Sequence, residues 1–197
     1  MATRVSFAAL LCSIAVTATH IHHPSSLATS VPSGSSSATS PEMASPESLQ
    51  VQLAAGPENT TVTCTIRNTD SEHSITFLTW DTPFDPTAVN TGVLTLTDAE
   101  TGADIPSPGM KLNRKMPPSR DALVEIAPKA SAERELNLSS PWIPTDRKKY
   151  QVAVNGTWRA VWQKPATQVS DEELAALKGD EAMTGGFESG SVEMVLG

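Results

Sequence analysis

Short runs of alternating apolar and polar residues fill the chain from Leu49 onward. The first two runs carry apolar residues at every second position, namely Leu49, Val51 and Leu53, and then Val62, Cys64 and Ile66. A period of two places these side chains on one face of an extended strand. The same pattern predicts strands in six later segments, which are Ser74 to Trp80, Val93 to Asp98, Leu123 to Ile126, Leu136 to Leu138, Tyr150 to Val154 and Trp158 to Trp162.

Turn-forming residues separate these runs. Asn155-Gly156 lies between two of them, and both residues tolerate a positive φ, so the pair predicts a tight hairpin. Other turn residues occur at Asn68 to Asp70, at Asp98 to Gly102 and at Ala127-Pro128. Short strands separated by frequent turns are typical of a sandwich or a barrel. The residues therefore predict an all-β, antiparallel body that spans residues 47–197.

One short helix is predicted near the C-terminus. Ser170 and Glu173 form a capping-box pair, and the two acidic residues between them suit the positive end of the helix dipole. Gly179 would end this helix. A helix of about two turns is too short to be stable alone, so we expect it to pack against an edge of the sandwich. Phe187 to Leu196 is predicted to form the last strand.

The first 46 residues differ in composition from the rest of the chain. Residues 1–18 carry Arg4, then an apolar run, then small residues up to Ala18, which is typical of a signal peptide cleaved after Ala18. Ser, Thr and Pro dominate residues 19–46, which are predicted to form a disordered leader. No other apolar run reaches ~18 residues, so no membrane-spanning segment is expected. We expect a secreted, extracellular protein.

The charge of the chain excludes one class of partner. Lys and Arg number 14 and Asp and Glu number 22, which gives a net charge of −8. Nucleic-acid binding needs clustered cations that displace counterions, so nucleic acid is not an expected partner. Much of the acidity lies in residues 165–197, the predicted acidic helix and last strand.

Cys64 is the only cysteine outside the predicted signal peptide. A disulfide within one mature chain is therefore excluded, so Cys64 is either buried as a small apolar residue or paired with another chain. Its place on the apolar side of its predicted strand favours a buried, unreactive thiol.

Candidate catalytic and metal-binding residues are few. His73 lies in a polar turn, and the chain has neither the Gly-x-Ser-x-Gly motif of a serine hydrolase nor the His-Glu-x-x-His motif of a zinc enzyme. His20, His22 and His23 would suit copper if the mature chain began close to them, but cleavage after Ala18 spoils that geometry. We expect no enzyme activity, no metal and no cofactor.

Three sequons are candidates for N-linked glycans: Asn59, Asn137 and Asn155. Asn155 is the doubtful one, because a tight turn at this position would hinder the transferase.

Two segments are candidates for binding a protein partner. Lys111, Arg114, Lys115 and Arg120 form a basic loop that would suit an acidic surface, and the alternative is a solvated loop. Trp80 and Phe84 place aromatic rings beside a proline turn, and the alternative for these rings is packing at the edge of the sandwich.

The body of the chain resembles a known type of domain. The resemblance rests on five segments in order: Thr63 to Asp70, Phe77 to Asp85, Lys115 to Ser119, Val124 to Pro128 and Tyr150 to Trp158. This order resembles the N-terminal pro-region of fungal secreted zinc endopeptidases of the deuterolysin and peptidyl-lysine type. The resemblance implies an immunoglobulin-like (Ig-like) β-sandwich that assists the folding of a protease and keeps it inactive.

The chain departs from that family because the catalytic domain and its zinc motif are absent from the sequence. No catalytic or metal-binding residue is implied by the resemblance. Our leading hypothesis is a secreted, non-catalytic sandwich that binds a protein in trans, with a secreted metalloendopeptidase as the implied partner. The alternatives are an extracellular or cell-wall adhesion module, a truncated zymogen fragment, and a copper-binding factor that uses His20.

Overall fold

Antiparallel β-strands form most of the computed structural model, which describes residues 46–177 and 182–197. The predicted signal peptide, almost the whole leader and Gly179 lie outside these residues. The strands are β1 (Leu49–Ala55), β2 (Thr61–Asn68), β3 (Ile75–Leu78), β4 (Leu94–Asp98), β5 (Asp104–Ile105), β6 (Leu123–Ile126), β7 (Ser131–Asn137), β8 (Lys149–Trp162), β9 (Met183–Glu188) and β10 (Val192–Val195). The α-helix is α1 (Asp171–Ala176), and short 3₁₀ turns are η1 (Pro46–Ser48), η2 (Ala88–Asn90), η3 (Arg120–Ala122) and η4 (Ala166–Gln168).

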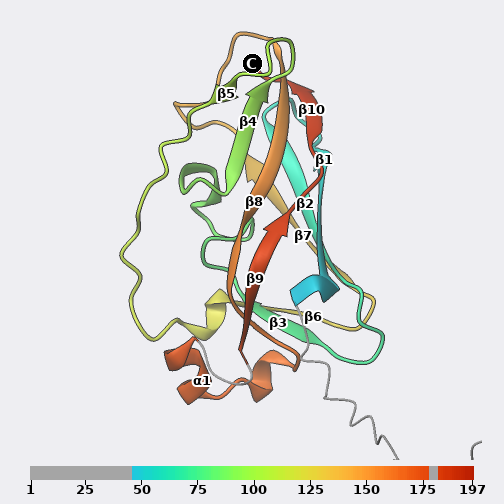
Figure 1. Cartoon of the computed structure of the whole chain (residues 1–197), viewed down its shortest axis with the longest axis vertical. Helices are drawn as coiled ribbons and strands as arrows, with labels where there is room; N and C mark the ends of the chain where they lie inside the picture. Colours follow the sequence, from blue (N-terminus) through green and yellow to red (C-terminus); the bar gives the residue numbers. More distant parts are fainter. Residues whose placement is uncertain (1–45, 178–181) are drawn as a thin grey trace, which may run out of the picture. The chain divides into compact units, whose positions relative to one another are not determined.

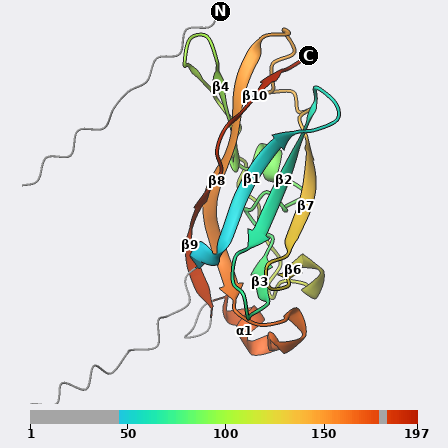
Figure 2. The same ribbon diagram turned by 90° about the vertical axis from the view of Figure 1, so that its right-hand side faces the viewer.

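The strands form two sheets that face each other. The smaller sheet has the order β1-β2-β7, and the larger follows the path β5-β4-β8-β3-β6, with β9 and β10 also paired to β8. Figures 1 and 2 show the β1-β2-β7 sheet packed along one face of the long strand β8. Every pairing between strands is antiparallel. The predicted all-β sandwich with one short helix is therefore confirmed.

Alternate residues of the two sheets meet in one apolar core. Val62, Cys64 and Ile66 of β2 are fully buried, as their spacing predicted. Trp158 of β8 lies at the centre of the aromatic part, with ring centroids 5.1 Å from Phe77 and 4.7 Å from Phe187. Burial raises the pKa of Cys64 to about 12, so this free, buried thiol stays protonated at neutral pH.

Strand β8 corrects the predicted hairpin at Asn155-Gly156. These two residues lie inside one strand of 14 residues, and Gly156 does not adopt a positive φ. A Cβ atom at Gly156 would lie 2.7 Å from Cζ of Phe187 on β9. Glycine is needed here for close packing between strands rather than for a turn.

A β-bulge in β8 serves two clusters of buried side chains. The register with β9 shifts between Trp158 and Val161, and both of these residues face the main core. Ala160 and Trp162 instead face a second cluster with Val169 and Leu174. An extra residue in one strand reverses which face the following side chains occupy, so one strand contributes to both clusters.

The predicted last strand is two strands. β9 pairs with the C-terminal half of β8, and β10 pairs with its N-terminal half. Residues 189–191 separate β9 from β10. At the interruption Ser189 N donates to Val154 O at 2.9 Å, and Val154 N donates to Ser189 Oγ at 3.0 Å.

The predicted C-terminal helix is confirmed with its capping box. Glu173 N donates to Ser170 Oγ at 3.2 Å, and Ser170 N donates to Glu173 Oε2 at 2.8 Å. Leu177 has a left-handed φ of 51° and ends the helix, so the helix stops before the predicted terminator Gly179. Leu174 is buried in the second cluster, so α1 packs against the sandwich as expected. Among the described residues no helix is long and apolar enough to cross a membrane.

Candidate functional site

The longest described segment without a helix or strand joins β5 to η3 and comprises residues 106–119. We call it the strap, and Figure 1 shows it running down one side of the domain as a yellow-green line. Irregular segments of this length in a compact domain are uncommon and often functional. The strap contains Lys111, Arg114 and Lys115, three of the predicted partner-binding residues.

A buried carboxylate anchors the strap at its middle. The Asp85 side chain has no exposed surface and forms an ion pair with Nη2 of Arg114. It also accepts hydrogen bonds from Thr87 N at 2.9 Å, from Thr87 Oγ1 at 2.6 Å and from Asp81 N at 3.0 Å. Burial alone would raise the pKa of Asp85, but these hydrogen bonds and the Arg114 charge outweigh burial and hold the pKa below its ordinary value.

Arg114 joins the two candidate segments into one site. Its guanidinium lies over the Trp80 ring, 5.5 Å from the ring centroid, in a cation–π arrangement. Nη2 of Arg114 is also 3.7 Å from Asp81 Oδ1, and Asp81 forms an ion pair with Arg159. A second anchor is the bond from Met110 N to Asn90 O at 2.9 Å. The strap is therefore held to the sandwich at two points.

Phe84, one of the two aromatic candidates for partner binding, packs inside the sandwich. Phe84 is only 5% exposed and packs edge-on against Phe77, with ring centroids 5.7 Å apart. It stabilises the core and has almost no surface to offer a partner. Trp80 is partly buried against the second cluster and is covered on one face by Arg114.

The remaining basic residues have two different surroundings. Lys111 and Lys115 are exposed on the strap. Arg120 instead ties α1 to the body, because its Nη2 donates to Asp171 Oδ1 at 2.6 Å and to Val169 O at 3.0 Å. Two exposed methionines were missed by the sequence analysis: Met110 is 51% exposed and Met116 is 50% exposed. Met110 directly precedes Lys111, and Met116 directly follows Lys115. This position beside charged residues was the sequence signal that the two methionines are exposed.

The structure places all three sequon asparagines on the surface. Asn59 lies in the turn between β1 and β2, and Asn137 ends β7 on the neighbouring strand of the same sheet. Asn155 lies in the middle of β8, opposite Glu188. Its backbone is extended, so the tight turn expected to hinder glycosylation is not there.

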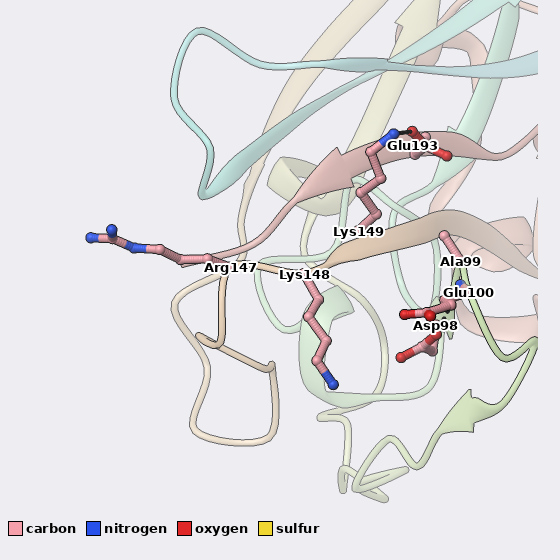
Figure 3. Close-up of a pocket in the computed structure, with 7 residues that line it drawn as sticks. All are labelled: Asp98, Ala99, Glu100, Arg147, Lys148, Lys149 and Glu193. Atoms are coloured by element: carbon pink, nitrogen blue, oxygen red, sulfur yellow. Dashed lines mark hydrogen bonds and ion pairs between the residues drawn. The ribbon is translucent and has the colours of Figure 1, made fainter.

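A charged pocket lies at one end of the larger sheet. Figure 3 shows Lys149 directed toward Glu193, with Nζ 2.7 Å from Oε1, and Arg147 directed away from the acidic groups. Backbone hydrogen bonds from Thr101 and Glu100 lower the pKa of Asp98. The sequence analysis did not select the basic run at residues 147–149. One ion pair, Lys149 with Glu193, joins residues that line this pocket, and both of its side chains are exposed. An exposed pair of this kind contributes little free energy, and nothing here singles out a ligand.

His73 lies in a polar turn, as predicted, and its partners are structural. Its Nδ1 is 3.4 Å from Asp70 Oδ1 and 3.1 Å from Gln163 Nε2. Hydrogen bonds from the backbone N–H groups of Glu72 and His73 lower the pKa of Asp70 to about 2. In the described part of the chain no group of three or more His, Cys, Asp or Glu side chains is placed to hold a metal ion. His20, His22 and His23 lie outside that part.

Comparison with known proteins assigns the fold seen here. A sequence profile of the immunoglobulin-like domain matches residues 48–196, which is most of the chain. The chain belongs to the immunoglobulin-like domain family. This Ig-like chain is 36% identical over 133 residues to an uncharacterized secreted protein of Arthroderma benhamiae, and the match covers 66% of each protein. The chain thus spans slightly less than two thirds of that relative's length. The similarity to a secreted protein confirms the predicted secretion to the extracellular space.

Proposed function

We propose that this secreted Ig-like domain binds another protein in trans, without catalysing a reaction, and that the strap is its contact surface. The observation that carries the proposal is the pair of half-exposed methionines, Met110 and Met116, beside exposed Lys111 and Lys115 on one anchored loop. Methionine is a common residue at interfaces because its flexible thioether adapts to a partner surface.

The anchors support a binding role because they reduce the entropy lost on binding. Arg114 holds the strap through Asp85 and Trp80, and Met110 N holds it through Asn90. A loop that is already ordered in its binding conformation loses less freedom when a partner arrives.

Charge supports an acidic partner. The chain carries a net charge of −8, yet the strap presents two exposed lysines. Asp81 and Asp85 do not offset them, because those carboxylates pair with Arg159 and Arg114. A local cationic surface steers association with an acidic surface and discriminates against basic ones.

The resemblance to metalloendopeptidase pro-regions supports a secreted metalloendopeptidase as the partner and a chaperone-like or inhibitor-like role. Inhibition would come from covering the active-site cleft rather than from coordinating its zinc, because Cys64 is fully buried and its thiol stays protonated. A non-catalytic role is supported by the lack of a hydrolase motif in the sequence.

A binding experiment tests this function. The secreted protein is mixed at micromolar concentration with a deuterolysin-type endopeptidase, and complex formation and peptidase activity are measured. We expect a complex and reduced activity. The double variant Lys111→Glu with Lys115→Glu should weaken the complex by roughly tenfold, from the loss of two surface charge pairs and the repulsion that replaces them.

The matched control is Arg67→Glu with Lys148→Glu, which makes the same charge change at exposed positions outside the strap. This control should bind like the unchanged protein. Unchanged peptidase activity together with no detectable complex contradicts the proposed function.

A further inference from the structure

A groove lies between the edge of β1 and the edge of the β9–β10 segment, which are close in space. Figure 2 shows the ribbons of these strands on the same side of the sandwich. Its lining comes from residues 49–52 of β1 and residues 186–188 and 190 of the β9–β10 segment. Within the described residues β1 pairs only with β2, and β9 pairs only with β8. Each strand therefore has one edge without a neighbouring strand, and the two edges border the same groove.

The register shows which backbone groups of β1 point away from β2. Thr69 N donates to Ser48 O at 2.8 Å at the start of the β1–β2 ladder. Hydrogen-bonded pairs alternate with non-bonded pairs in an antiparallel ladder. Leu49 and Val51 therefore direct their N–H and C=O groups toward the free edge.

The same argument applies to β9. Ser189 N donates to Val154 O at 2.9 Å, in the register of the β8–β9 ladder. Gly186 and Glu188 occupy the non-bonded positions of that ladder. Their backbone donors and acceptors face the groove, where an added strand would find them.

Two glycines at the groove, Gly186 and Gly190, have no close packing contact with the residues that the structure describes. A Cβ atom at Gly186 would come no closer than 3.8 Å to the nearest neighbouring atom, and one at Gly190 would meet nothing within 4 Å. Neither has a positive φ. Gly185, in contrast, is needed because its Cβ would lie 2.6 Å from Pro46 Cγ. A glycine without a local steric reason often marks a place where another backbone approaches.

The lining also indicates the chemistry of an occupant. Leu49, Val51 and Phe187 are 6 to 8% exposed and give the groove an apolar floor. Among the described residues that line the groove, Glu188 is the only charged one, and it is exposed. An occupant with a cation opposite Glu188 is favoured over one with a carboxylate there.

We propose that this groove binds an extended segment of a partner protein as an added β-strand, with apolar side chains on the floor and a Lys or Arg opposite Glu188. Main-chain hydrogen bonds to a sheet edge supply affinity in this mode of recognition, and alternate side chains supply specificity. The site is separate from the strap, so its occupation does not depend on the function proposed above.

Amide exchange of the full secreted chain, measured by NMR, tests the proposal. The probe is a capped heptapeptide in which Val alternates with Arg, compared with a Val/Glu peptide and with a Val/Arg peptide interrupted by Pro. At about ten times the dissociation constant, the Val/Arg peptide should slow exchange about tenfold at Leu49, Val51, Gly186 or Glu188. The other two peptides should bind more weakly.

A charge variant with a matched control completes the test. Glu188→Lys should weaken binding of the Val/Arg peptide about fivefold, whereas Glu135→Lys, at an exposed position on β7, should leave it unchanged. No binding of the Val/Arg peptide at millimolar concentration overturns the proposal. It is equally overturned if these amides are already protected in the free protein, because a second copy or the chain's own N-terminal segment then occupies the edges.

Discussion

Asp85 shows how one buried residue changes the role of its neighbours. Its carboxylate forms an ion pair with Arg114, so this arginine anchors the strap and does not contribute a free charge to the predicted basic loop. Lys111 and Lys115 on the same segment have no such acid within it and remain exposed. Arg114 meets Asp85 although the two residues are 29 positions apart in the sequence. The sequence pattern could therefore not show that Arg114 is paired while Lys111 and Lys115 are exposed.

Removing the Asp85 carboxylate should destabilise the fold. Asp85→Ala leaves the Arg114 charge partly buried without its partner and removes the acceptor for Thr87 and Asp81. We expect a loss of about 3 kcal/mol in the free energy of unfolding, measured by urea denaturation. Asp171→Ala breaks the exposed ion pair with Arg120 and should leave the midpoint nearly unchanged. Equal effects of the two variants would contradict a structural role for the buried pair.

The low pKa of Asp70 predicts a dependence of stability on pH. Its pKa falls from 3.8 to about 2 on folding, so the unfolded state binds more protons between these values. The stabilisation is fully present above pH 3.8 and is lost as the pH falls toward about 2. Unfolding measured across this range should show a flatter pH profile for Asp70→Asn than for the unchanged protein. Parallel profiles would show that the carboxylate is not stabilised on folding.

At the scale of elements, β8 determines how the two sheets and the helix meet. Its alternation continues through Asn155-Gly156, and its bulge then directs Trp162 into the cluster that holds α1. The sequence analysis assigned the two halves of β8 correctly as extended and joined them wrongly. Asn-Gly is a strong hairpin signal. Here, however, β4 and β10 pair with the first half of β8 and β3 and β9 pair with the second half, which favours one continuous strand.

Gly156 offers a test of this packing. Gly156→Ala places a methyl group 2.7 Å from the Phe187 ring, so we expect it to destabilise the protein by about 1–3 kcal/mol through overpacking. Gly186→Ala is the matched control, because its new Cβ meets no atom closer than 3.8 Å. Thermal unfolding of both variants measures the difference. A Gly156→Ala protein as stable as the control would contradict the close approach of β8 and β9.

At the scale of the whole molecule, the sandwich carries two candidate binding surfaces in different places. The strap packs on the segment around Trp80 and Asp85, whereas the groove lies between the edges of β1 and β9. The strap offers side chains, and the groove offers backbone groups. A partner could therefore contact one surface without blocking the other.

Export makes a prediction about the mature chain. The signal peptide is expected to be cleaved after Ala18, so N-terminal sequencing of the secreted protein should begin at Thr19. A mature chain that begins at His20 would instead support the copper-binding alternative.

Glycosylation makes a second prediction about the secreted chain. Treatment with an amidase that removes N-linked glycans should lower its mass, because Asn59, Asn137 and Asn155 are all exposed.

Local patterns determined which segments are extended and where the capped helix begins, because the side-chain period and the pairing of Ser170 with Glu173 each act over neighbouring residues. The apolar N-terminal run predicts export in the same local way. Tertiary structure alone decided that Phe84 is buried, that Arg114 is an anchor, and that β1 and β9 border one groove. These outcomes depend on segments distant in sequence and on competition between burial, charge pairing and strand pairing, which no local pattern encodes.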